Sequence, residues 1–515
     1  MTMKDEWECA KENIEHINDA HAATSFDALS DDVIAHALSF CDARTLDTLT
    51  RTARRFRASG NNVVERGAET SVRRRERVKG GILLSVRPGE SWVRALAFVE
   101  AREEAEMFGL ASVSASENAT TVVTRSGDVY VWGNVEDGAK KSYSSANEAS
   151  GSFRPRAVHA AAGYACVIRA SCDAFHVEAL ATSTTGVGSP GSPGNFHQSS
   201  TVQDELSRIL IPPHAHAFGD VRVVQIALGR VHALACTTNG KVFSWGGDAA
   251  GQLGHGSRAL GEAIARISLG RSPTVNTVRT KRRMHGGGGS PPLSLHQTFL
   301  TDPGPRQILA LSDENVVKVC ASRYSSMVLT KDGKVFSFGD NREGLLGVGD
   351  TIVRCSPTHV ATIKEDVVDV CLGAHHALAV TDDGQVYSWG SNRRRQLGYD
   401  GEASSPWPGL VPLETQDVAR CAGGGAHSIC LTKNGYLYTF GANDDYQCGQ
   451  KQENDESHPG RVPGIPSRIV EIAAGSKHSV AVDASGVVYG FGSNEKGQLG
   501  NFERSIVRTA RVCRI

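Results

Sequence analysis

The chain lacks the features of a membrane or secreted protein. Across its 515 residues there is no run of about 18 apolar residues, the length that a membrane-spanning helix requires. The N-terminal stretch MTMKDEWECAKENIEH is polar and acidic, without the apolar core of a secretory signal. Charge of one sign is not in excess, because the net charge is −1. The sequence therefore predicts no membrane partner and gives little reason to expect a nucleic-acid partner.

Motifs that carry catalysis are also missing from the sequence. There is no nucleophile elbow, no glycine-rich phosphate loop that opens a helix, and no HExxH pair of histidines. The 12 cysteines are scattered without a CxxC pair, and several, such as Cys236, Cys371 and Cys430, lie in apolar strand patterns. We expect buried free thiols in a reducing compartment, the cytoplasm or the nucleus, and a protein without enzymatic activity, metal or cofactor.

The sequence is instead rich in glycine, and a ten-residue pattern recurs along it. One copy reads TDDGQVYSWG from Thr381, and five further copies place a glycine at the same point. These turn glycines are Gly127, Gly240, Gly333, Gly384, Gly435 and Gly486. The last four are 51 residues apart, and Asn-Gly or Asp-Gly at such a point is a strong signal for a β-hairpin. A period of about 50 residues predicts a propeller or a similar array.

Two kinds of side chain repeat with the turn. An aromatic residue follows the turn glycine by five positions, at Trp132, Trp245, Phe338, Trp389, Phe440 and Phe491. A large ring at one fixed place in every unit is expected to pack against the next unit rather than bind a ligand. A histidine precedes the turn by eight positions, at His232, His376, His427 and His478. One histidine per unit cannot converge on one metal ion, so we expect buried imidazoles that hydrogen-bond neighbouring strands.

A GQLG-like motif completes the repeat. It begins 11 residues after the turn glycine and occurs at 251–254, 344–347, 395–398, 446–449 and 497–500. With this motif, the units resemble the repeats of the regulator of chromosome condensation family. The resemblance covers residues 105–515 and implies a mainly β fold, a seven-bladed β-propeller, preceded here by a small all-α N-terminal region.

The propeller has irregular parts in this sequence. Six units are clear, and 157–183 fits a degenerate second blade. The polar tail 1–25 is expected to be disordered, and 181–204 and 257–300 are expected to be flexible loops. The tail 505–515 resembles the opening strand of a unit, whereas the first unit lacks such a strand. We therefore expect the tail to complete the first blade and close the ring.

The N-terminal region is expected to be helical. Residues 26–60 predict two short amphipathic helices, with Ser30 and Asp42 as their N-terminal caps. A helical linker at 61–104 follows, and an amphipathic helix is predicted at 91–107. Two such helices bury too little apolar surface to be stable alone. They therefore need a partner, either the rest of this chain or another protein.

The segment 26–60 also resembles an F-box. Acidic residues open an apolar helix, and an Asp-containing turn, a Leu-x-x-Leu helix and a basic stretch with an aromatic residue follow. It departs from the family at Ser30, where F-boxes usually carry proline. The resemblance implies a face for the Skp adaptor of a cullin ligase, formed by Leu29, Val33, Ile34, Leu38, Leu46, Leu49 and Phe56. The alternative is a plain helical hairpin that packs on the propeller.

Two functions follow from these resemblances. The first is a non-catalytic scaffold in which the helices bind the Skp adaptor and the propeller recruits an unknown protein substrate for a ubiquitin ligase. The second is guanine-nucleotide exchange on a Ran-like GTPase with association to chromatin, the activity of the founding member of the propeller family. The basic residues within 257–300 keep the second function open, whereas the acidic N-terminus speaks against it.

Overall fold

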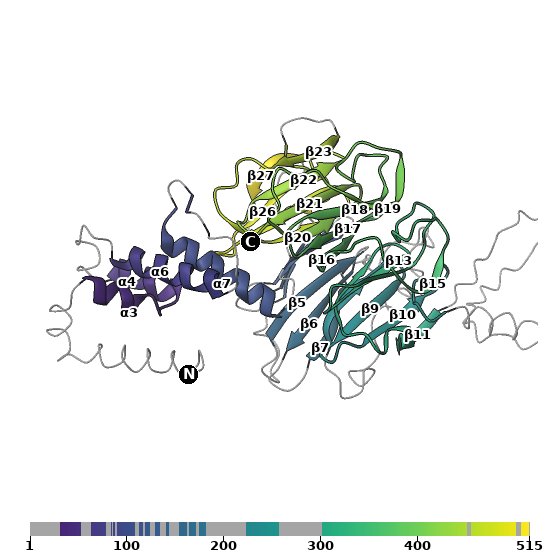
Figure 1. The fold of residues 1–515 in the computed structure, drawn as a ribbon, viewed down its shortest axis with the longest axis horizontal. Helices are drawn as coiled ribbons and strands as arrows, with labels where there is room; N and C mark the ends of the chain where they lie inside the picture. The colour runs from purple at the N-terminus through teal and green to yellow at the C-terminus, as the bar shows by residue number, and fades with distance from the viewer. Residues whose placement is uncertain are drawn as a thin grey trace, which may run out of the picture. The chain divides into compact units, whose positions relative to one another are not determined.

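The computed structural model describes residues 31–52, 63–78, most of 84–181, and then 223–256, 301–450, 455–500 and 506–513. The chain divides into two compact units. The helical unit comprises the chain up to Phe108 together with Ser467–Val470 and Asp483–Val487. The sheet unit comprises Gly109–Pro466, Glu471–Val482 and Val488–Ile515. Figure 1 shows the helices in purple and blue and the strands from blue through green to yellow.

Four helices form the described part of the helical unit. They are α3 (Asp31–Leu38), α4 (Ala43–Thr52), α6 (Val63–Val78) and α7 (Trp92–Phe108). Helices are thus present within both 26–60 and 61–104, as the sequence predicts. Asp42 caps α4, because its Oδ1 accepts the backbone N–H of Thr45 at 2.7 Å. Ser30, the other predicted cap, lies outside the described residues.

The helical unit has an apolar core of its own. Ile34 of α3 and Leu46 of α4 are 1% and 0% exposed, and they belong to one buried cluster with side chains of α6 and α7. At the edge of this core, Arg75 of α6 pairs with Glu100 at 3.1 Å and with Glu103 at 2.7 Å, both on α7. The two short N-terminal helices therefore find their apolar partner within this chain.

Seven sheets account for the described strands of the sheet unit. Sheet 1 holds β1 (Val113–Ala115), β2 (Thr120–Val123), β3 (Val129–Trp132) and β4 (Lys141–Tyr143). Sheet 2 holds β5 (Arg154–Ala161), β6 (Tyr164–Ala170) and β7 (Phe175–Ala181). Sheet 3 holds β8 (Val223–Leu228), β9 (His232–Thr237), β10 (Val242–Gly247) and β11 (Thr301–Gln307), and the short 3-10 helix η3 (Leu309–Leu311) follows it.

The other four sheets follow the 51-residue repeat. Sheet 4 holds β12 (Val316–Ala321), β13 (Ser325–Thr330), β14 (Val335–Gly339) and β15 (Arg354–His359). Sheet 5 holds β16 (Val367–Leu372), β17 (His376–Thr381), β18 (Val386–Ser391) and β19 (Ser404–Leu410). Sheet 6 holds β20 (Val418–Gly423), β21 (His427–Thr432), β22 (Leu437–Gly441) and β23 (Glu456–Arg461). Sheet 7 holds β24 (Ile469–Ala474), β25 (His478–Asp483), β26 (Val488–Gly492) and β27 (Val507–Val512).

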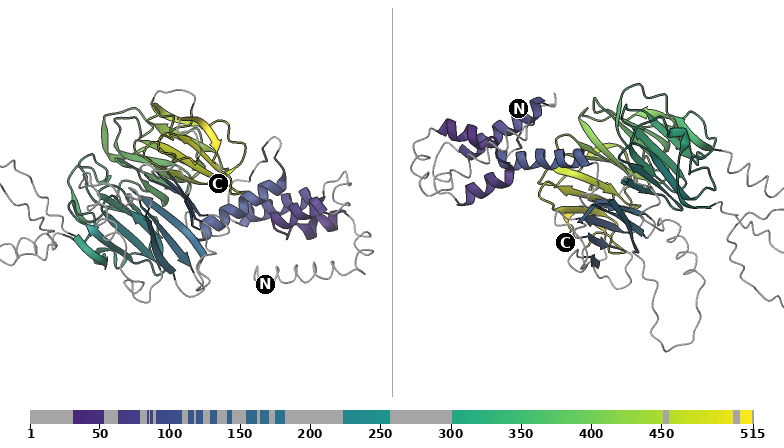
Figure 2. Two further views of the ribbon diagram at one scale, coloured as in Figure 1. Left: turned by 180° about the vertical axis from the view of Figure 1, so that it is seen from behind. Right: turned by 90° about the horizontal axis from the view of Figure 1, so that it is seen from below.

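Five of the predicted turn glycines, Gly240, Gly333, Gly384, Gly435 and Gly486, join the second and third strands of their sheets, and Gly127 lies outside the described residues. Gly384, between β17 and β18, has φ of +83°, and a Cβ there would lie 2.3 Å from the carbonyl oxygen of Gln416. A residue other than glycine would be strained in this conformation and would clash. In each four-stranded sheet the strands lie in sequence order, and consecutive sheets follow one another in both Figure 1 and Figure 2.

The repeated aromatic residues pack between sheets, as predicted. Five of the six rings lie against the last glycine of a GQLG-like motif in another sheet: Phe338 on Gly254, Trp389 on Gly347, Phe440 on Gly398, Phe491 on Gly449 and Trp132 on Gly500. In the first four pairs the glycine belongs to the preceding sheet. The fifth pair joins sheet 7 to sheet 1, and an apolar cluster shared by these two sheets surrounds it.

The C-terminal tail does not complete the first sheet, so that prediction is wrong. β27 pairs antiparallel with β26, with Tyr489 opposite Val512, and is the fourth strand of sheet 7. Sheet 1 has four strands of its own, and Val113–Ala115 supplies the opening strand that the sequence pattern seemed to lack. The physical reason is local: the GQLG motif turns the chain back along its own sheet, as it does before β15 and β19.

The degenerate second unit does form a sheet. β5, β6 and β7 pair antiparallel in sequence order, so 154–181 is a three-stranded sheet that matches the expected position of 157–183. The expected loops after residue 181 and at 257–300 lie outside the described residues, as does the tail 1–25. Among the described helices, none is long and apolar enough to cross a membrane.

Candidate functional site

The repeated histidines connect neighbouring sheets. Each imidazole Nε2 lies 2.9 Å from a hydroxyl oxygen in the next sheet: His232 with Ser326, His376 with Ser428, His427 with Ser479 and His478 with Thr120. The last of these bonds joins sheet 7 to sheet 1. The four imidazoles are fully buried. The prediction of structural histidines that bridge strands is thereby confirmed, and the fixed spacing serves packing.

The direction of these hydrogen bonds follows from the serines. Ser428 Oγ donates to the carbonyl oxygen of Gln396 at 2.8 Å, so it accepts a hydrogen bond from His376 Nε2. The imidazole is then neutral with its proton on Nε2. Burial lowers the pKa of His232, His376 and His427 to about 3 and that of His478 to about 4. These groups are therefore structural and do not act as proton carriers near neutral pH.

Between sheets 4 and 5 the histidine contact is absent, and both of its side chains are replaced. Sheet 4 carries Ser325 in place of the histidine, and sheet 5 carries Ala377 in place of the serine. The glycine that precedes the histidine is lost too. A Cβ at Gly424 would lie 2.2 Å from His427 Cε1, whereas sheet 4 tolerates Ser322 at this position. Ser322 Oγ donates to Gly373 O at 2.6 Å and so replaces the missing bridge between these sheets.

No group of three or more histidine, cysteine or acidic side chains suitable for a metal ion occurs among the described residues. The cysteines within those residues are free, and Cys236, Cys371 and Cys430 are buried, as the sequence predicts. Burial raises the pKa of the Cys236 thiol to about 12, so this sulfur stays protonated and unreactive at neutral pH.

A cavity of about 160 Å³ lies where the loops between first and second strands meet. We call it the mouth. Its lining comes from six sheets, with Arg230, Arg323, Ala374, Gly425 and Ser476 at corresponding points of their loops and Ser116 in the loop of sheet 1. Backbone bonds link the loops, because Arg230 N–H donates to Arg323 O at 3.3 Å and Ser476 N–H donates to Ser116 O at 3.2 Å. The mouth is therefore a rigid concave site made by six sheets together rather than by one sheet.

Side chains hold one cation of the mouth in place. Arg323 Nη1 lies 3.2 Å from His375 Nε2, and His375 Nδ1 lies 2.9 Å from Glu343 Oε2. A guanidinium can only donate, so His375 Nε2 accepts the hydrogen bond from Arg323. Arg323 is thus positioned without losing its positive charge to a direct carboxylate partner.

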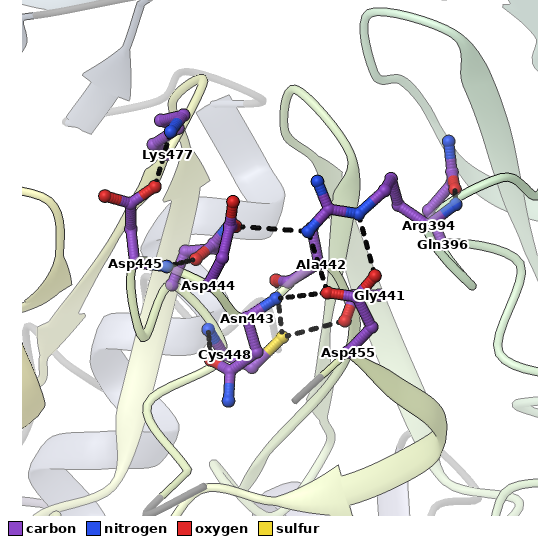
Figure 3. Close-up of polar contacts among 11 residues, drawn as sticks. Arg394, Gln396, Gly441, Ala442, Asn443, Asp444, Asp445, Cys448, Asp455 and Lys477 are labelled. Carbon is purple, nitrogen blue, oxygen red and sulfur yellow. Dashed lines mark hydrogen bonds and ion pairs between the residues drawn. The ribbon is translucent and has the colours of Figure 1, made fainter. Parts of the chain in front are cut away.

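A second polar cluster ties the loops of sheets 5, 6 and 7 together (Figure 3). Arg394 makes a two-point contact with Asp455, with Nε 2.7 Å from Oδ2 and Nη2 2.9 Å from Oδ1. Its Nη2 also lies 3.4 Å from Asp444 Oδ1. Lys477 of sheet 7 reaches back to Asp445 of sheet 6 at 2.6 Å.

These contacts shift the pKa values of the charged groups in the cluster. The hydrogen bond that Arg394 donates to Asp455 raises the pKa of Arg394, and the one that Lys477 donates to Asp445 raises the pKa of Lys477. Burial acts to raise the pKa of Asp444, but the hydrogen bond from Gln447 and the nearby cations outweigh it and lower that pKa. Both cations of this cluster are thus neutralised by carboxylates within the molecule, and they are not available to bind an anion.

The structure places the predicted adaptor-binding residues in different environments. Ile34, Leu38 and Leu46 are buried in the core of the helical unit, at 1%, 6% and 0% exposure. Val33 and Leu49 lie on α3 and α4. Leu29 and Phe56 lie outside the described residues. The three buried leucine and isoleucine side chains therefore stabilise the helical unit, and the exposed side of α3 and α4 carries other residues, among them His36 and Arg44.

The sequence analysis did not identify the residues of the mouth, nor the serines that accept hydrogen bonds from the histidines. The serine signal was present, because Ser326, Ser428 and Ser479 each stand one position after the histidine position of the repeat. The mouth gave no such signal. Arg230 and Arg323 stand at a repeat position that holds alanine, glycine and serine elsewhere, so only the fold shows that they meet.

Comparison with known proteins supports the repeat. A family model described as regulator of chromosome condensation (RCC1) repeat matches 332–380, 383–431 and 434–482. A second model of the same repeat matches 223–252, 316–345, 367–396 and 469–498. The human WBSCR16 crystal structure is similar in fold, with a TM-score of 0.51, 19% identity and coverage of 73% of this chain and 87% of that one.

Curated relatives match the repeat region of this chain. Mouse E3 ubiquitin-protein ligase HERC2 is 31% identical over 59% of this chain and 7% of its own length. Human probable E3 ubiquitin-protein ligase HERC3 is 32% identical over 61% of this chain and 31% of its own length. The chain thus spans less than a third of either relative. Sequence, strand order and these matches together establish that the chain carries regulator of chromosome condensation repeats in a mainly β, propeller-like fold.

Proposed function

We propose that this protein is a non-catalytic substrate receptor of a cullin-type ubiquitin ligase. The seven sheets are the blades of one closed β-propeller that recruits a protein substrate, and the helical unit binds a Skp-type adaptor. The observation that carries the proposal is the kinship of the repeats to proteins named as E3 ubiquitin-protein ligases. The helical unit before the repeats, with its F-box resemblance, supports the adaptor role. The site of action is the cytoplasm or the nucleus.

Burial refines the adaptor contact. Ile34, Leu38 and Leu46 hold the helical unit together, so the adaptor binds the exposed side of the same helices. His36 of α3 and Arg44 of α4 are exposed and can change without opening the core. They are therefore better probes than the buried leucines and isoleucine. Replacing any one of those by alanine would lower the stability of the unit by about 2–5 kcal/mol.

Co-elution of the full chain with a recombinant Skp adaptor tests this proposal. We expect the wild type to co-elute and the double variant His36→Glu/Arg44→Glu to lose binding, because two charge reversals disrupt a protein interface. Thr70→Glu, on the exposed side of α6, is the matched control and should bind as the wild type does. A wild-type chain that does not co-elute contradicts the adaptor role.

The second candidate function is nucleotide exchange on a Ran-like GTPase with association to chromatin. No observation among the described residues favours it over substrate binding, and the basic segment 257–300 lies outside them. Release of labelled nucleotide from a Ran-like GTPase is the assay that separates the two functions. Accelerated release by a chain that fails to bind the adaptor would replace the first proposal with the second.

A further inference from the structure

The mouth carries positive charge on one side only. Arg230 of sheet 3 and Arg323 of sheet 4 are exposed neighbours, joined by the backbone bond between their loops. Arg230 has no ion-pair partner among the described residues, and Arg323 contacts a ring nitrogen of His375 rather than a carboxylate. Both guanidinium groups are therefore free to accept an anion.

The cations of the second polar cluster are already neutralised. Figure 3 shows Lys477 on Asp445 and Arg394 on Asp455 and Asp444, all in sheets 5 to 7. Among the residues that line the mouth, Arg230 and Arg323 are the basic ones in the described part of the chain. They differ from the cations of the second polar cluster in pairing rather than in residue type.

The mouth also has space for a ligand beside the arginines. At the corresponding loop points, sheets 5, 6 and 7 carry Ala374, Gly425 and Ser476, whose small side chains leave the cavity of about 160 Å³ open. That volume suits a few side chains of an extended peptide rather than a folded element. The backbone bonds between the loops hold the rim in place before any ligand binds.

We propose that the mouth binds an acidic peptide segment, with aspartate or glutamate carboxylates on Arg230 and Arg323. The planar guanidinium groups match carboxylates in two-point contacts. A nucleic acid is disfavoured, because only two basic side chains line the mouth, too few to neutralise a run of phosphates. This inference deepens the proposed function, since it names the class of segment by which the propeller recruits its substrate.

Fluorescence anisotropy with the full chain and a labelled hexa-aspartate peptide tests the inference. We expect saturable binding that weakens as salt is added, because the contacts are exposed ion pairs. Arg230→Ala/Arg323→Ala should weaken binding roughly 10-fold or more at low salt, through the loss of two charge-assisted contacts. Arg393→Ala removes an exposed arginine from a loop of sheet 5 outside the mouth, and it should leave binding unchanged.

Control probes make the outcome specific. A hexa-asparagine peptide should not bind, and a single-stranded oligonucleotide should bind more weakly than hexa-aspartate. The inference is overturned if the wild type does not bind hexa-aspartate, if the double variant binds it equally well, if Arg393→Ala is equally damaging, or if the oligonucleotide binds more tightly. Adaptor co-elution of the full chain tests the helical unit and does not depend on the mouth, so the two proposals can fail separately.

Discussion

At the scale of residues, the repeat is a set of linked choices rather than a string of independent ones. A histidine at the bridging position requires a glycine three residues earlier, because a Cβ there would lie 2.1–2.5 Å from its ring. It also requires a hydroxyl in the next sheet. Sheet 4 abandons the histidine and the glycine together, and sheet 5 lacks the hydroxyl. The histidine, its glycine and its hydroxyl partner are thus absent together between sheets 4 and 5, as this linkage requires.

Paired substitutions test this linkage. Gly424→Ala should destabilise the sheet unit strongly, since the new Cβ would lie 2.2 Å from His427 Cε1. Gly424→Ala combined with His427→Ser imitates the small residues of sheet 4 and should recover part of the loss, leaving a deficit of about 2–4 kcal/mol for the emptied space. Urea unfolding of the three chains measures the effect. A double variant less stable than Gly424→Ala alone would refute the linkage.

The buried imidazoles also set a pH dependence. Their folded pKa values, about 3 to 4, lie below the ordinary value of 6.5, so the unfolded chain binds more protons between these limits. Stability is then fully present above pH 6.5 and falls as the pH drops toward 4, by roughly 1.4 kcal/mol per pH unit for each histidine.

Urea midpoints between pH 7.5 and 4.5 measure this dependence. A chain with His427→Ser should show a shallower decline than the wild type, because one titrating group has gone. The account of neutral buried imidazoles is wrong if the wild type keeps its full stability down to pH 4.5, or if the variant follows the same curve.

At the scale of elements, hairpins and helices could be predicted because their signals are local. The turn glycine Gly384 and the cap Asp42 each act within a few residues of their own position. The fourth strand of each sheet could not be placed in the same way. The pattern of 505–515 is compatible with either end of a unit, and only the pairing of β27 with β26 decides it.

The helix cap gives a test at this scale. Asp42→Ala removes the acceptor for Thr45 N–H at the start of α4 and should cost about 1 kcal/mol in the helical unit. Asp42→Asn keeps an acceptor at the same point and should cost less. Thermal unfolding followed by the helical circular dichroism signal compares the two variants. Equal losses would show that the side chain contributes charge rather than a cap.

At the scale of the whole molecule, the contacts between sheets 7 and 1 decide the architecture. His478 reaches Thr120, and Trp132 packs on Gly500, by the same contacts that join sheets within the repeat. The mouth exists as one cavity only if sheets 7 and 1 are in contact, because Ser116 and Ser476 form part of its rim. The sequence predicted closure but assigned it to the wrong strand, because packing between the ends of a chain has no local signal.

A double-mutant cycle on His478→Ala and Thr120→Val tests closure most directly. If the two side chains meet, the account predicts a coupling of about 1 kcal/mol in the free energy of unfolding, equal within error to that of the reference pair His427→Ala and Ser479→Ala. A coupling near zero at the first pair, with normal coupling at the reference pair, would mean that sheets 7 and 1 are apart. That result would contradict the closed propeller and the mouth built on it.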